Sequence, residues 1–130
     1  SIDANEDFKI NFKETTYETA YVDKNLLLKT LNEHGVADLA ESNNEISCNI
    51  EDYTLIFSRE NDSEPYLLKI KCPEKCQTEE KINNLNEEYT LNVQEEAYLS
   101  IIENLKDNNM SLEKEEVLED NTIVLTVNIE

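Results

Sequence analysis

Glycine, proline and histidine are scarce in this chain of 130 residues, which contains one Gly, two Pro, one His and no Trp. A single His and the lack of a glycine-rich loop exclude the usual nucleophilic and phosphate-binding sites of enzymes. The turns must use other residues. The seventeen Asn and the Asp residues suit them, because both residue types tolerate left-handed backbone conformations. We expect a protein that is not an enzyme, with no catalytic residue and no cofactor.

Basic residues are also few. Eleven Lys and Arg stand against thirty Asp and Glu, which gives a formal net charge of −19 at pH 7. Contacts to phosphate need Lys and Arg, so this balance argues against direct binding to nucleic acid or to an anionic membrane. It favours a basic protein partner, a bound cation, or an acidic surface that serves only solubility.

No stretch of the sequence approaches the roughly 20 consecutive apolar residues of a membrane-spanning helix. The first residues lack a positively charged segment followed by an apolar run, so no signal peptide is expected within this sequence. The length suits one domain. We expect a soluble, cytoplasmic protein with a single domain over residues 1–130, of which residues 1–7 form a flexible lead-in. The oligomeric state stays open.

Residues 78–109 carry the most regular pattern in the chain, with apolar side chains at steps of three or four. These side chains are Ile82, Leu85, Tyr89, Val93, Ala97, Ile101 and Leu105. The spacing predicts an α-helix with Thr78 as its N-cap. Such a helix would be about 45 Å long, so we expect either a break near Thr90–Asn92 or a projecting end. Further apolar residues in its second half predict deeper burial there.

Alternating apolar and polar residues predict strands on both sides of this helix. The segments are 8–12, 46–50, 53–58, 66–72, 110–118 and 122–130. Residues 15–22 are also expected to be extended, either as a continuation of the first strand after a bend or as its hairpin partner. A shorter helix is expected between Asp23 as N-cap and Gly35 as its left-handed C-terminal residue, followed by a polar connection over residues 37–44. The order is strand, helix, two or three strands, helix and two strands, in short β-α-β-β-α-β-β. It predicts an α+β fold, with a single antiparallel sheet and two helices packed on one face.

Three cysteines and one histidine are the candidates for a metal site. Cys72 and Cys76 have a spacing found in zinc sites, but a tetrahedral site would also need Cys48 and His34. A second interpretation is a disulfide between Cys48 and Cys72, which requires that their strands be neighbours. The third, which we favour, is that Cys48 and Cys72 pack as small apolar residues and that Cys76 is a loop thiol. We therefore assign no metal, and expect His34 to interact with the end of its own helix.

Pairs of glutamates recur every eight residues along the long helix. They form the candidate interaction surface: Glu79, Glu80, Glu87, Glu88, Glu95 and Glu96. Eight residues advance about 12 Å and turn about 80° beyond two full turns, so the pairs spiral around the helix. A merely solvated helix face explains the same pattern.

Three functional hypotheses follow from this composition. The first is a non-enzymatic module that docks a basic protein partner through its acidic surface. The alternative is a nucleic-acid mimic that inhibits a DNA- or RNA-binding protein, because a spiral of carboxylates can imitate a phosphate track. The third, a small metal- or ligand-binding domain, depends only on Cys48, Cys72 and Cys76.

The second half of the chain also resembles a known family. The resemblance is carried by the hairpin Tyr53–Cys72, by the stretch Leu85–Tyr89 that enters a helix, and by the acidic and β-branched ending Leu112–Val127. Over about residues 45–129 these features are similar to the conserved hypothetical proteins of cyanobacteria and plastids, typified by hypothetical chloroplast reading frame 35. The resemblance implies a small soluble domain of unassigned activity, and it provides no catalytic residue.

Overall fold

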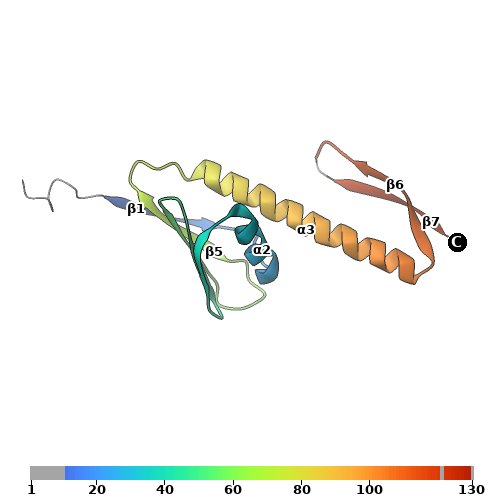
Figure 1. The fold of residues 1–130 in the computed structure, drawn as a ribbon, viewed down its shortest axis with the longest axis horizontal. Coiled ribbons are helices and arrows are strands. Elements are labelled where there is room, and N and C mark those ends of the chain that lie inside the picture. The colour runs from blue at the N-terminus through green and yellow to red at the C-terminus, as the bar shows by residue number, and fades with distance from the viewer. Residues whose placement is uncertain (1–10, 121, 130) are drawn as a thin grey trace, which may run out of the picture. The chain divides into compact units, whose positions relative to one another are not determined.

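A computed structural model describes residues 11–120 and 122–129. The expected lead-in, and Phe8 and Ile10 of the expected first strand, lie outside the described residues. The chain forms two compact units, unit 1 up to Tyr89 and unit 2 from Thr90, where the sequence predicted one domain. The elements, shown in Figure 1, are β1 (Phe12–Glu18), α2 (Lys24–His34), β2 (Ala37–Glu41), β3 (Glu45–Ile50), β4 (Tyr53–Ser58), β5 (Leu67–Pro73), α3 (Glu79–Asp107), β6 (Met110–Val117) and β7 (Ile123–Ile129).

Unit 1 contains a five-stranded sheet with the strand order β1-β5-β4-β3-β2. Every pair of neighbouring strands is antiparallel. Strands β2 to β5 follow one another as a meander, and β1 pairs with β5 at the far edge. The helix α2 connects the two edge strands, and together with the first part of α3 it covers one face of the sheet (Figure 1). The predicted α+β class is confirmed.

The core of unit 1 lies between this face of the sheet and the two helices. Its strand residues alternate as predicted and are at most 4% exposed: Ile46, Cys48, Leu55, Phe57, Leu68 and Ile70. The helices and their flanking segments contribute Tyr21, Leu27, Leu31, Leu85 and Tyr89. The ring of Tyr21 lies 4.6 Å from that of Tyr89 and 6.1 Å from that of Phe57. These aromatic contacts connect α3 to the centre of the sheet.

Both predicted ends of α2 are confirmed. The carboxylate of Asp23 accepts a hydrogen bond from the Leu26 amide at 3.1 Å, as an N-cap does. Gly35 has φ 80° and ψ 37°, and its amide donates to the carbonyl of Asn32. This left-handed residue ends the helix and turns the chain into β2.

The region 37–44 was predicted to be a polar connection, and this prediction is wrong because it contains β2. β2 pairs with β3, with a register shift between Ala37 and Ala40. Only Leu39 is half-buried within β2, so the strand lacks the apolar alternation that identifies strands in a sequence. Asp38, beside the shift, has a φ of 54°, which agrees with the expected use of Asp and Asn in place of Gly.

The helix α3 runs from Glu79 to Asp107. It has no break near Thr90–Asn92, which was one of the two alternatives predicted from its length. Asn109 follows it with a φ of 56° and turns the chain into β6, again in place of a glycine. The predicted deeper burial of the second half is wrong, since Leu91 is 62% exposed and Leu99 is 57% exposed. Val93 and Ile101, which belong to the apolar stripe itself, are also 40% and 44% exposed. Steps of four residues move the stripe about 40° around the helix each time, so its members do not share one side of the helix.

A single sheet was predicted, and this is wrong because β6 and β7 form a separate two-stranded sheet. β6 pairs antiparallel with β7, which follows it after a short turn, as strands joined by a tight connection commonly do. No apolar side chain of unit 2 is buried among the described residues. Ile123 and Leu125, which the alternation places inward, are half-buried, whereas Ile129 is 72% exposed.

Candidate interaction surface

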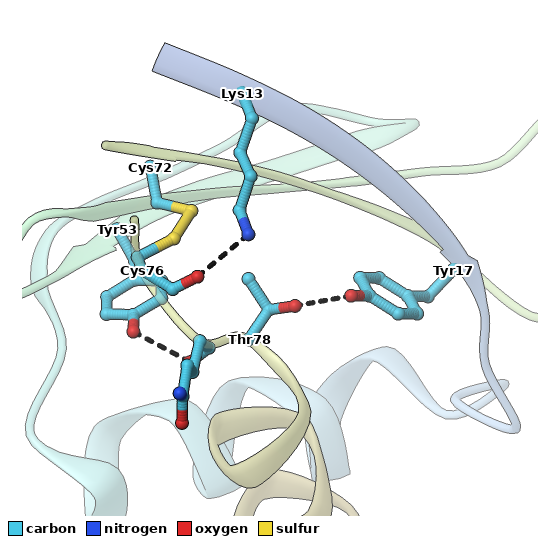
Figure 2. The surroundings of a disulfide bond; sticks show 7 residues. Lys13, Tyr17, Tyr53, Cys72, Cys76 and Thr78 are labelled. Atoms are coloured by element: carbon cyan, nitrogen blue, oxygen red, sulfur yellow. Dashed lines mark hydrogen bonds between the residues drawn. A yellow bond between two sulfur atoms is a disulfide. The ribbon is translucent and has the colours of Figure 1, made fainter. Parts of the chain in front are cut away.

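The segment before α3 is fixed to three strands of the sheet, as Figure 2 shows. Cys76 forms a disulfide with Cys72 at the end of β5. The ammonium of Lys13, on β1, donates to the carbonyl oxygen of Cys76 at 2.8 Å. The hydroxyl of Tyr53, on β4, donates to the carbonyl oxygen of Gln77 at 2.8 Å. These contacts leave the start of the helix little freedom to move.

Thr78 completes this attachment. Its side chain is buried, and its hydroxyl oxygen lies 2.5 Å from the hydroxyl oxygen of Tyr17 on β1 (Figure 2). Its carbonyl accepts a hydrogen bond from the Ile82 amide at 3.0 Å, which is the first bond of the helix. The predicted start of α3 at Thr78 is confirmed, and Glu79 and Glu80 follow in the first turn, where the helix dipole favours negative charge.

Glu79 and Glu80 line an open hollow of about 730 Å³ beside this segment. The other lining residues are Lys13, Cys76, Gln77, Thr78, Asn83 and Asn84. Both glutamates are exposed, and neither forms an ion pair with another described residue. Lys13 is the one cation of the lining, and its ammonium already donates to a backbone carbonyl. The hollow offers carboxylate and amide oxygens, which are the acceptors that a guanidinium or ammonium group needs.

The next pair of the predicted surface is divided between two roles. Glu87 is exposed. Glu88 is paired with His34, whose Nδ1 lies 2.8 Å from the Glu88 carboxylate. His34 does lie in the last turn of α2, as predicted, but its ring interacts with this side chain on α3. Glu88 therefore helps to hold the two helices together, and Glu87 remains available to a partner.

The last predicted pair, Glu95 and Glu96, belongs to unit 2, and both side chains are exposed. By helical geometry, Glu80 and Glu87 point within about 20° of each other, whereas Glu96 is rotated about 180° from Glu87. The six glutamates therefore do not share one face of α3. Of the six, Glu79 and Glu80 are the pair that lines the hollow in unit 1.

The three cysteines do not form one cluster. β4 lies between β3, which carries Cys48, and β5, which carries Cys72. Two strand spacings amount to about 10 Å, too far for a disulfide between them. Cys48 is a free, buried thiol, and burial raises its pKa to about 12. Among residues 11–120 and 122–129, no group of three potential metal ligands is found.

Cys72 is buried as predicted. The expectation that Cys76 is a loop thiol is wrong, because Cys76 is bonded to Cys72, a pairing that was not among the interpretations drawn from the sequence. The hollow was also missed. Its lining comes from the loop after β5, from the first turns of α3, and from Lys13 on β1, which lies more than sixty residues earlier in the chain. The amide-rich stretch from Gln77 to Asn84 was the available signal in the sequence, but it does not reveal which strand lies beside it.

Comparisons with known proteins add no relative: no protein-family model, no curated protein and no solved structure matches this chain. The resemblance to the plastid reading-frame family therefore stays a prediction. None of the helices in the described part of the chain is both long enough and apolar enough to cross a membrane.

Proposed function

We propose that this protein is a non-enzymatic interaction module, which docks a basic protein partner at the start of α3. The observation that carries this proposal is the hollow lined by Glu79 and Glu80, two exposed carboxylates that no described cation neutralises. An arginine of the partner can form two parallel hydrogen bonds with a carboxylate, and the neighbouring amides can accept its remaining donors.

The rigidity of this segment supports the same proposal. A disulfide from β5 and hydrogen bonds from β1 and β4 fix the residues directly before Glu79. A carboxylate on a fixed backbone loses less conformational freedom on binding than one on a loose loop, so more of the interaction energy is available for affinity. The net charge of −19 adds long-range attraction for a basic partner and speeds its approach.

Affinity capture tests the proposal. The protein is immobilised, incubated with nuclease-treated lysate of its host, and washed at low and at high ionic strength. We expect a basic protein that is retained at low salt and released at high salt, because salt screens attraction between exposed charges. Retention of proteins without a basic surface, or retention that salt does not change, would contradict the proposal.

The second candidate function is mimicry of nucleic acid. It is favoured by one observation: α3 is unbroken from Glu79 to Asp107, so all three glutamate pairs lie on one helix at intervals of about 12 Å. Competition decides between the two functions. If added DNA displaces the captured protein, the acidic helix occupies a nucleic-acid site; if DNA has no effect, docking at the hollow stands.

A further inference from the structure

The outer edge of β7 is unlike the other free strand edges of this protein. The two sheets leave four strands with a free edge among the described residues, namely β1, β2, β6 and β7. Charged residues occur in β1, β2 and β6, whereas β7 has the uncharged sequence IVLTVNI. Charges on edge strands prevent pairing with other chains, and β7 also lacks Pro and Gly, which would do the same.

The hairpin of β6 and β7 is also small for a sheet. Two strands alone are marginally stable in water and need a further strand or a helix against their apolar face. Ile123 and Leu125 share a hollow with Ala97 and Ile101 of α3, so the helix covers the first part of β7. β7 carries apolar residues at every second position, yet Val127 is 37% exposed and Ile129 is 72% exposed. Val124, on the opposite face, is 42% exposed. A further strand beside β7 would extend the sheet and cover part of this apolar surface.

We propose that β7 pairs antiparallel with β7 of a second copy of this chain, which gives a four-stranded sheet with the order β6-β7-β7-β6. A two-fold axis at Thr126 pairs all seven residues of the strand. It sets Ile123 opposite Ile129 of the second copy and Leu125 opposite Val127. All four lie on one face because they are two residues apart, so the two copies form one continuous apolar face.

The apolar residues on one face of β7 are spaced symmetrically about Thr126, so an identical strand matches each of them, and this favours a second copy as the occupant. The charge of the strand is compatible with this pairing. An uncharged strand gains no ion pair from a basic or acidic peptide, but it meets no repulsion from an uncharged strand like itself. The acidic β6 strands of the two copies then lie three strand spacings, or about 14 Å, apart. This separation exceeds the Debye length of about 8 Å at physiological ionic strength, so their repulsion is largely screened.

Dimer formation and docking of a basic partner respond to salt in opposite directions. Two chains of charge −19 repel, so added salt should strengthen the dimer. The proposed docking to a basic partner should weaken under the same conditions. A failure of one proposal therefore leaves the other testable.

Sedimentation of the full chain over a range of concentrations tests this inference. We expect a monomer–dimer equilibrium that shifts toward dimer as salt is raised. Thr126→Lys and Thr126→Glu should each weaken the dimer by about tenfold, since they set like charges opposite each other at the two-fold axis. An equimolar mixture of the two variants should restore the dimer, because unlike charges then meet.

Ser111→Lys is the matched control, because it adds the same charge to β6, whose edge the proposed dimer does not use. It should leave the dimer unchanged or slightly strengthened, since it lowers the net negative charge. A chain that stays monomeric at high salt and high concentration would overturn the inference. Equal dimerisation of Thr126→Lys and the unmodified chain would also overturn it, as would a mixture that recovers no dimer.

Discussion

The hydroxyl oxygens of Tyr17 and Thr78 lie 2.5 Å apart, although sixty-one residues separate them in the chain. Tyr17 points from the edge strand β1 toward the residue directly before α3 (Figure 2). This bond fixes where α3 begins, and therefore where Glu79 and Glu80 lie relative to the sheet. The candidate surface thus depends on a contact that no local pattern in the sequence encodes.

Removing this bond should measurably destabilise unit 1. Tyr17→Phe should lower the free energy of unfolding by about 1 kcal/mol, the usual net value of a partly buried hydrogen bond. Thr78→Val should cost a similar amount, and urea denaturation monitored by circular dichroism measures both. Because the two variants remove the same bond, the double variant should cost less than the sum of the single ones. Additive costs would show that the hydroxyls do not interact in solution.

The disulfide between Cys72 and Cys76 should stabilise the fold modestly, because it closes a short loop. Chain-entropy arguments give about 2 kcal/mol for a loop of this length. In urea denaturation without reductant, the free energy of unfolding of Cys76→Ser should be lower by this amount. Dithiothreitol should lower the free energy of unfolding of the unmodified chain to that of the variant. The reductant should leave Cys76→Ser unchanged, which is the control. A variant as stable as the oxidised chain would contradict this account.

Thiol titration separately tests the state of all three cysteines. In the oxidised, folded protein at pH 8 no thiol should react, since the Cys48 thiol is buried and its pKa is raised to about 12. One thiol should react after denaturation without reductant, and three after reduction. If two or more thiols react in protein that is taken from cells and denatured without reductant, the disulfide does not form in the cell. That result would favour the expected cytoplasmic location, because disulfides persist mainly in oxidising compartments.

The raised pKa of Cys48 also predicts how stability changes with pH. Above its ordinary value of 9.0, the thiol ionises in the unfolded chain but stays protonated in the folded one. The contribution of Cys48 to the stability of the fold is therefore fully present below about pH 9, and it is lost as the pH rises toward 12. Cys48→Ala should flatten this part of the stability profile. If the stability of the variant falls with pH as steeply as that of the unmodified chain, other groups cause the loss of stability at alkaline pH.

Gly35 offers a test of backbone strain without side-chain crowding. Its φ of 80° disfavours residues with a Cβ, yet a Cβ built there meets no atom within 4 Å. Gly35→Ala should therefore cost about 1 kcal/mol through strain alone. Gly35→Asn should cost less, since Asn tolerates this conformation better. Equal costs for the two variants in thermal or urea denaturation would argue against this explanation.

Local patterns in the sequence predicted much of the fold. The ends of α2 follow from Asp23 and Gly35, and the alternation in β3 to β5 follows from burial of one face. These features depend on interactions between residues close in the chain or on a simple period. β2 was missed because its backbone pairing is unaccompanied by apolar alternation.

Strand partners and the candidate surface could not be predicted in the same way. The pattern of β6 and β7 shows that they are strands, but it does not show whether they join the first sheet. The glutamate spacing on α3 correctly indicated a spiral, but it gave no reason to distinguish Glu79 and Glu80 from Glu95 and Glu96. That distinction comes from β1 and from the loop after β5, which complete the hollow only in the folded chain.

Binding of the captured basic partner to two charge-matched variants tests the central claim most directly. Glu79→Gln combined with Glu80→Gln removes two charges at the hollow. Glu14→Gln combined with Glu18→Gln removes two from exposed positions on β1, and is the control for net charge. We predict that the first variant loses about tenfold or more in affinity, and that the control stays close to the unmodified chain. Equal losses in both would show that only net charge matters, and would contradict a docking site at the start of α3.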